Sequence, residues 1–282
     1  MTTALTDTRR PASTGRPAPG GSGLTFPRVV ASEWIKLRTL RSTVWTLVVT
    51  VALMVGVALL AAWGFTQAAE DGGGSAAGAF ATTVGSNVAQ MSIAVLGVLI
   101  ITGEYTTGMV RSTFAAVPTR LPALAAKALV LTATILVVGL VSVALAYLAT
   151  LPLLAGTGLE IDLGEPESLR ILVGTALYLT AVALLAFAFG ALIRHSAGAL
   201  AAVLGLLLVV EPLFGNIPLA FFREVSPYLP STAGSRVMMP DEFNAALGGE
   251  AALGPWQGYG VMLAWVAVVL AIAAVLLRRR DA

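Results

Sequence analysis

The chain has 282 residues, of which 57% are hydrophobic and only 11% are charged, with a formal net charge of +2. Soluble domains carry about 25% charged residues, so a chain this poor in charge could not cover the surface of a soluble fold of its size. We therefore predict an integral membrane protein. The absence of cysteine and the single histidine, His195, exclude disulfides, thiolate nucleophiles and metal sites built from cysteines or several histidines.

Residues 1–27 are rich in Thr, Pro, Gly, Ser and Arg and show no apolar periodicity, which is typical of a disordered tail. Residues 28–43 differ, because Val30, Trp34 and Leu37 recur at the spacing of one helix face. The charged remainder of this segment consists of Glu33, Lys36, Arg38 and Arg41. We expect an amphipathic helix at the membrane interface, with the tryptophan at headgroup level. A basic flank that only sets the topology is a compatible alternative.

Six apolar runs follow, and most have the roughly 20 residues that a helix needs to cross the hydrocarbon core. They are Val44–Phe65, Thr82–Thr102, Leu124–Leu154, Ile171–Ile193, Ala197–Val210 and Gly258–Leu277. The fifth is short and stops at Glu211-Pro212, so it spans the membrane only if it continues to about residue 214 as a kinked or broken helix. We predict an all-α polytopic membrane domain over residues 28–282, with six transmembrane helices.

The orientation follows from the basic residues. With the N-terminus inside, the inner segments hold 14 Lys and Arg residues and the outer segments hold three, namely Arg170, Arg223 and Arg236. Eleven of the 15 acidic residues then lie outside. Because an excess of Lys and Arg marks the cytoplasmic side, we predict that both termini are cytoplasmic.

The predicted outer connections differ in character. Gln67–Ala81 is rich in Gly, Ala and Ser and is expected to be a flexible loop, and Ala155–Arg170 is acidic. Glu211–Gln257 begins with an apolar part that three residues interrupt, Pro212, Gly215 and Pro218. We expect one or two short re-entrant or surface helices that cap the outer mouth of the protein. An ordinary exposed loop with aromatic belt residues is the alternative.

Several kinds of chemistry have no signature here. The sequence contains no phosphate-binding loop, no H-E-x-x-H and no G-x-S-x-G motif, so we expect neither an enzyme nor a bound cofactor. Acidic residues are nearly absent from the predicted spans, with Glu104 at an inner end and Glu211 at an outer end. Ion-coupled carriers bury such charges, so we expect the energy for any transport to come from another subunit.

The inner connection Gly103–Lys127 is predicted to contain a short amphipathic helix parallel to the bilayer. Val110, Phe114 and Val117 form its apolar stripe, Met109 lies beside them and Arg111 projects away. Pro118 ends the helix, since proline cannot continue the hydrogen-bond ladder. Arg120 and Lys127 mark the return to the membrane.

Glu104 lies where the second span leaves the hydrocarbon. We expect it to pair with a basic residue of the connection, Arg111, or of the 28–43 helix, Lys36 or Arg38. A solvated interfacial carboxylate is the alternative, because exposed ion pairs contribute little.

The segment GEYTTGMVRSTFAAVPTRLPALAAK resembles the E-x3-G…P-x-R…K pattern of the ABC-2 type transporter permeases. The matching residues are Glu104, Gly108, Pro118, Arg120 and Lys127. The earlier segment ASEWIKLRTLRSTVWTL is similar to the start of actinobacterial members of that family, which open with S-E-x-x-K-L-R.

The resemblance implies a multi-pass protein of a bacterial cell membrane that pairs with a second permease, as a homodimer or heterodimer. It implies two cytoplasmic ATP-binding subunits, which hold ATP and Mg, and no nucleic acid. The connection between spans two and three would act as the coupling helix, and the segment between spans five and six would form short extracellular helices. The cargo would be a hydrophobic or amphipathic compound, such as a drug, antibiotic, peptide or lipid.

We assign docking contacts to Met109, Val110, Arg111 and Phe114, and a hinge to Gly103, Gly108 and Pro118. The glycines could instead serve helix packing or a turn. Asn87 and Gln90, three residues apart on one face of the second span, are candidates for the pathway, as are Glu211 and Pro212 for an outer gate. Hydrogen bonding between helices is the simpler explanation of the two amides, and we favour it.

Two other classes of function remain as alternatives. A membrane scaffold or regulator would transport nothing and would not stimulate an ATPase. A secondary carrier would need a charge inside the membrane, which the sequence does not supply.

Overall fold

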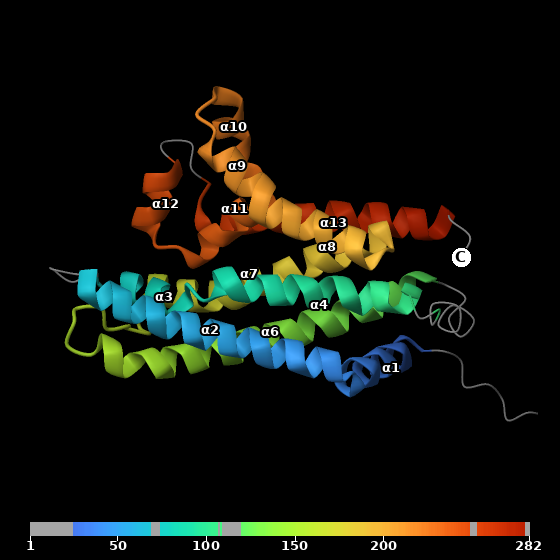
Figure 1. Cartoon of the computed structure of the whole chain (residues 1–282), viewed down its shortest axis with the longest axis horizontal. Helices are drawn as coiled ribbons and strands as arrows, with labels where there is room; N and C mark the ends of the chain where they lie inside the picture. The colour runs from blue at the N-terminus through green and yellow to red at the C-terminus, as the bar shows by residue number, and fades with distance from the viewer. Residues whose placement is uncertain (1–24, 69–73, 107, 109–119, 249–252, 280–282) are drawn as a thin grey trace, which may run out of the picture.

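The structure is a computed structural model that describes residues 25–68, 74–106, 108, 120–248 and 253–279. Within these residues every regular element is a helix (Figure 1). Six stretches are long and apolar enough to cross a membrane: Arg41–Gln67, Gly74–Thr106, Leu121–Leu154, Pro166–Ile193, Ser196–Asn216 and Pro255–Leu277. The prediction of an all-α protein with six membrane-spanning helices is confirmed in this respect, whereas its orientation stays a prediction.

Helix α1 (Phe26–Thr39) lies at one end of the bundle and precedes the first long helix, α2 (Arg41–Ala68). It starts two residues before the predicted segment, so residues 26 and 27 are helical and the prediction of a disordered tail is wrong for them. Residues 1–24 of that tail lie outside the described residues. The buried face of α1 carries Val29, Glu33 and Leu37 at four-residue spacing, and Trp34 is exposed. The face of α1 that packs against the bundle therefore includes Glu33, one of the charged residues of the predicted helix, whereas the position of Trp34 at headgroup level stays a prediction.

Helix α3 (Gly74–Thr83) shows that the prediction of a flexible loop is wrong for residues 74–81; residues 69–73 lie outside the described residues. A turn separates it from α4 (Ser86–Thr106), and the two together form the second candidate span. A β-carbon at Gly78 would lie 2.0 Å from the carbonyl oxygen of Leu159, and one at Gly85 would lie 2.3 Å from that of Met54. The small residues thus allow close packing of helices and do not form a linker.

Helix α7 (Pro166–Ile193) is the centre of the bundle. It packs against α4, α6 (Arg120–Leu154) and α13 (Pro255–Arg279). In its most apolar stretch 72% of the residues are buried, against 17% for α2. The core around it is built from side chains such as Ile93, Leu131, Tyr178, Phe187 and Met262.

The fifth span continues past its predicted stop. Helix α8 (Ser196–Gly205) passes into a π-helical turn, η1 (Leu206–Val210), and then into α9 (Glu211–Asn216). Pro212 sits in the first turn of α9, where its missing N–H and its ring disturb the ladder of the preceding turn, and the wider π-helical turn accommodates this. The expected kinked continuation is thereby confirmed, and a stop at Val210 is wrong.

The segment after α9 forms short helices. They are α10 (Ala220–Val225), η2 (Ser226–Tyr228), α11 (Pro230–Gly234), η3 (Ser235–Met238) and α12 (Asp241–Gly248). Helices α9 and α10 project sideways from the bundle, whereas α11 lies against it beside α13 (Figure 1). Short helices were predicted here, and the described part of this segment is helical and no ordinary loop, but it forms five short helical elements where one or two were expected, and their capping role stays a prediction.

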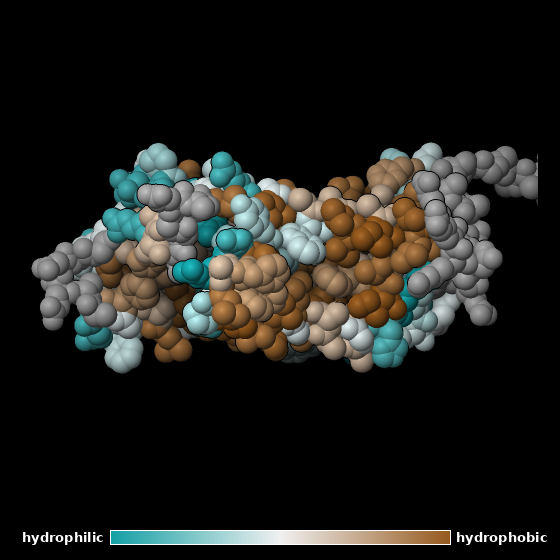
Figure 2. All heavy atoms as spheres, turned by 90° about the horizontal axis from the view of Figure 1, so that it is seen from above, coloured by the Kyte–Doolittle hydropathy of each residue, from teal (hydrophilic) through white to brown (hydrophobic). Residues whose placement is uncertain are grey.

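The two ends of the bundle differ in content. One end, called the α1 end, holds α1, the C-terminal end of α4, the turn at Arg194 and the end of α13; the other, called the α12 end, holds α3 and α12 (Figure 1). On the face drawn in Figure 2, hydrophobic residues cover most of the half toward the α1 end, and hydrophilic residues gather over the other half. A bilayer-embedded protein with a polar crown at the α12 end matches this distribution.

Candidate functional site

Four charged residues meet at the α1 end and form what we call the charge cluster: Glu33 and Lys36 of α1, Glu104 of α4 and Lys127 of α6. The Lys36 Nζ lies 2.7 Å from Glu33 Oε1 and 3.1 Å from Glu104 Oε1. The Lys127 Nζ lies 2.9 Å from Glu104 Oε1 and also contacts Glu33 Oε2. Each lysine therefore bridges both carboxylates, and three helices are joined.

The charge cluster is largely withdrawn from solvent. The side chains of Glu33, Lys127 and Glu104 are 4%, 8% and 12% exposed. Burial lowers the pKa of Lys36, but the hydrogen bond to Glu33 and the charge of Glu104 outweigh it, so the pKa of Lys36 lies above its ordinary value. Two acids and two bases balance in charge, and removing one would leave a buried charge without its partner.

The expected pairing of Glu104 with Lys36 is confirmed, since the two side chains share a hydrogen bond. A solvated carboxylate is wrong for Glu104. Lys127, the last residue of the motif, was predicted to mark the return of the chain to the membrane and was given no ion-pair partner, whereas it bonds to both carboxylates of the charge cluster. Glu33 and Lys127 are 94 positions apart, so no local sequence pattern indicates their contact.

The proposed docking residues Met109, Val110, Arg111, Phe114 and Pro118 lie outside the described residues, as does the coupling helix itself. Arg120 begins α6. Gly108 has a φ of +71°, and its N–H donates to the carbonyl oxygen of Tyr105, 3.4 Å away. Glycine suits this left-handed position, so Gly108 serves a turn after α4.

Arg194 is one of the inner basic residues counted for the predicted orientation, and it also makes a contact between helices. It lies in the turn between α7 and α8, with a φ of +60°. Its guanidinium lies over the ring of Tyr105, 5.5 Å from the centroid, at the end of α4. This cation–π contact holds the α7–α8 turn against the helix that leads into the proposed docking segment.

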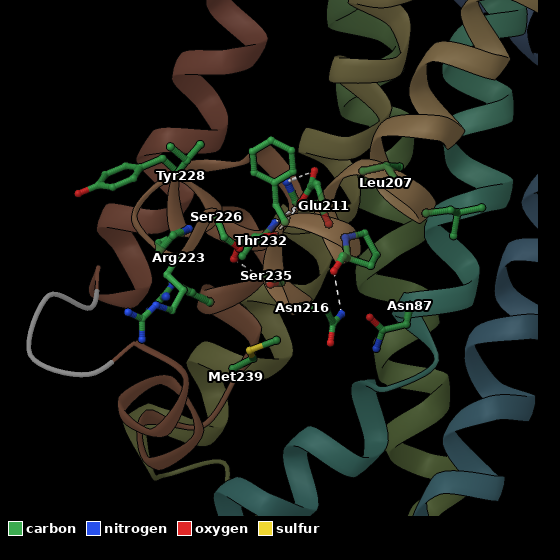
Figure 3. Close-up of a pocket in the computed structure, with 18 of the residues that line it drawn as sticks. Asn87, Leu207, Glu211, Asn216, Arg223, Ser226, Tyr228, Thr232, Ser235 and Met239 are labelled. Carbon is green, nitrogen blue, oxygen red and sulfur yellow. Dashed lines mark hydrogen bonds between the residues drawn. The ribbon is translucent and has the colours of Figure 1, made fainter. Parts of the chain in front are cut away.

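A cavity of about 1290 Å³ lies between the bundle and the projecting helices (Figure 3). All four predicted pathway or gate residues, Asn87, Gln90, Glu211 and Pro212, line it. They come from α4 and α9, which are far apart in the sequence. The structure thus brings this predicted set together at one site.

Glu211 is 4% exposed and ties the fifth span to α11. Its Oε1 accepts the Ser231 N–H at 2.9 Å, and its Oε2 accepts the Thr232 N–H at 2.6 Å and the Thr232 hydroxyl at 2.9 Å (Figure 3). The carboxylate thereby satisfies the free N–H groups at the start of α11. Glu211 lies five residues before the end of the candidate stretch Ser196–Asn216, and Glu104 lies two residues before the end of Gly74–Thr106, which agrees with their predicted positions at span ends.

A chain of hydrogen bonds continues from α11 into the bundle. The Tyr178 hydroxyl lies 2.7 Å from Ser231 Oγ and donates to Gln90 Oε1 at 2.6 Å. Gln90 therefore bonds between helices, as favoured, and also lines the cavity. The exposed Asn87 donates from its side-chain amide to the carbonyl oxygen of Val84, in the turn before α4, at 3.1 Å.

Arg170 of α7 organises the α12 end. Its Nη2 lies 2.8 Å from Asp241 Oδ1 and 3.4 Å from Glu167 Oε1. Its Nη1 donates to the carbonyl oxygens of Val237 and Met239 at 3.2 and 3.0 Å. These contacts fix η3 and the start of α12 on the central helix, and therefore fix one wall of the cavity.

Among the residues that the structure describes, no group of three or more His, Cys, Asp or Glu could hold a metal ion. No protein-family model matches the chain, and no curated protein matches it. The two sites therefore have to be interpreted from their own geometry: a buried charge cluster at one end of the bundle and a lined cavity toward the other.

Proposed function

We propose that the chain is the permease subunit of an ATP-driven transporter, exporting a hydrophobic or amphipathic compound with the help of a separate ATP-binding subunit. The motif over Glu104–Lys127 and the absence of a phosphate-binding loop support this proposal. The six candidate spans agree with a permease of this architecture. The termini and the charge cluster face the cytoplasm in this proposal, and the cavity faces the outside.

The observation that carries the proposal is the position of the charge cluster. Glu104 lies two residues before the end of α4, and Lys127 lies in the second turn of α6, so the cluster joins the helices on both sides of the proposed docking segment. Glu33 and Lys36 add α1 to the same unit. A push on the docking segment would therefore move α1, α4 and α6 together as a rigid body.

The cavity supplies the second half of the proposal. Its walls come from α4 and α7 of the bundle and from α9 to η3. A rigid-body movement of α4 would change the wall that carries Asn87 and Gln90 relative to the wall that carries Glu211. Nucleotide-dependent closure at one end would in this way alter the cavity toward the other end.

Co-purification from native membranes tests the partnership. We expect the chain to bring down a nucleotide-binding subunit, and Arg111→Ala with Phe114→Ala to abolish the complex. Ser112→Ala, between these positions, is the matched control and should leave the complex intact. An intact complex in the Arg111 and Phe114 variant would refute the docking assignment, and uptake driven by an ion gradient with the chain alone in liposomes would favour a carrier.

A further inference from the structure

Two buried charges line the cavity, Glu211 and Arg236, and each is only 4% exposed. Within the described residues, neither has an oppositely charged side chain at ion-pair distance, whereas Lys36, Lys127 and Arg170 all do. The Arg236 Nε is moreover buried without any hydrogen-bond partner there. The Glu211 carboxylate is hydrogen-bonded by three neutral donors of α11 and the Arg236 guanidinium by one carbonyl, so in the described part of the chain each charge is held in place but lacks a counter-charge, which buried charges normally have.

Glu211 and Arg236 are attached to one short helical stretch at backbone positions four residues apart. Glu211 binds the start of α11 at Ser231 and Thr232, and Arg236 follows Thr232 by four residues in η3. A helical rise of about 1.5–2.0 Å per residue separates these points by roughly 6–8 Å along the axis. The Arg236 Nη1 donates to the Leu253 carbonyl at 3.1 Å, which holds the guanidinium in place.

The remaining lining is amphipathic and electrically balanced. Tyr178, Ser231 and Ser235 supply neutral hydrogen-bonding groups, and Leu207, Leu208 and Phe214 supply an apolar wall on the side of the fifth span. Arg223 and Glu224, adjacent on α10, are both exposed. Because the charges of Arg223 and Glu224 are opposite and adjacent, Glu211 and Arg236 determine which charged groups a ligand of the cavity should carry.

We propose that the cavity binds a zwitterionic amphiphile, whose cationic group lies toward Glu211 and whose anionic group lies toward Arg236. The apolar part of the ligand lies along Leu207, Leu208 and Phe214. Such a ligand compensates both buried charges at once, whereas a cation or an anion alone leaves one of them unpaired. The claim that this ligand is the exported compound rests on the proposed function. The claim that the cavity binds such a ligand does not.

A headgroup series on one hexyl chain tests the site. The four probes carry phosphocholine, trimethylammonium, sulfate and glucoside headgroups, and they are titrated calorimetrically into the purified full chain in neutral-detergent micelles, with empty micelles as the blank. We expect the phosphocholine probe to bind about tenfold more tightly than each of the others, since each unpaired buried charge costs at least about 1.4 kcal/mol. Equal binding of all four probes would overturn the proposal even without any variant.

Two substitutions assign the charges. Glu211→Gln should remove the advantage of phosphocholine over sulfate, and Arg236→Gln should remove its advantage over trimethylammonium. Arg223→Gln, at an exposed position of the cavity lining, should leave the ranking unchanged. If a substitution weakened the binding of all four probes equally, the substituted charge would have a structural role, and its proposed role in recognising the ligand would be overturned. Because these titrations contain no ATP-binding subunit, their failure is distinct from a failure of ATPase coupling.

Discussion

At the residue scale, the charge cluster joins α1, α4 and α6 through two carboxylates and two ammonium groups that are in mutual contact. The sequence predicted an ion pair for Glu104 and named Lys36 as one candidate partner, because both residues flank the membrane interface. It gave neither Lys127 nor Glu33 a partner, because their contact joins helices that are distant in the sequence. Spacing along one helix predicts its faces, but not which neighbour packs there.

Substitution of Lys127 tests the charge cluster. Lys127→Met leaves Glu33 and Glu104 with only Lys36 between them, so we expect a loss of about 3 kcal/mol in the free energy of unfolding. Unfolding in detergent measures this loss, and Arg38→Met, an exposed position on α1, is the control. The double variant Glu104→Gln with Lys127→Met should lose less than the sum of the two single changes. Strict additivity would show that the residues do not interact.

The pKa of Lys36 gives the charge cluster a defined response to pH. Glu33, Glu104 and, next to them, Lys127 are the charged groups around it. Its pKa is raised above the ordinary value of 10.5, so its contribution to stability is full below that pH and is lost as pH rises through the folded-state pKa. We expect the difference in unfolding temperature between the unsubstituted chain and Lys36→Met to be constant from about pH 6 to 9 and to shrink above about pH 10.4. A difference that shrinks toward acid pH would contradict this assignment.

At the element scale, the apolar runs predicted the long helices well, because twenty apolar residues in a row have few other structures available. The errors fall at small residues and prolines. The segment before α4 looked like a flexible linker, yet its glycines and alanines form α3 against neighbouring backbone. Composition alone does not distinguish a residue that is small for flexibility from one that is small for packing.

Gly85 provides the test at this scale. Its α-carbon faces the backbone of Met54, so Gly85→Ala forces α2 and α4 apart, and we expect a loss of about 2 kcal/mol in the free energy of unfolding. Gly64→Ala on α2 is the control, because nothing lies within 4 Å of an added β-carbon there. Equal stability of the two variants would show that the close approach of Gly85 to the backbone of Met54 does not contribute to packing.

At the scale of the whole molecule, the six spans were predictable and the two sites were predictable only in part. All four pathway residues reached one cavity, but Tyr178, Ser231 and Arg236 on its walls gave no sequence signal. Tyr178 looks like any aromatic residue of an apolar run, and its role depends on a hydrogen bond to Gln90, 88 positions away. The packing of distant helices brings such residues together, and a local sequence pattern cannot predict that contact.

The orientation is testable because the chain contains no cysteine to interfere. Glu160→Cys at the α12 end and Ala197→Cys at the α1 end both lie at exposed positions. We expect a membrane-impermeant maleimide to label Glu160→Cys in intact cells, and to label Ala197→Cys only after lysis, since the basic residues mark the cytoplasmic side. The reverse pattern would place the cavity in the cytoplasm and would exclude export in the proposed sense.

The rate of ATP hydrolysis by the co-purified ATP-binding subunit tests the central claim most directly. Reconstituted with the unsubstituted chain, the subunit should hydrolyse ATP faster than alone; with Glu104→Gln and Lys127→Met together it should still bind, but lose that stimulation, because α4 and α6 no longer move as one unit. A hydrolysis rate that the chain leaves unchanged, or equal stimulation by the variant, would contradict the account.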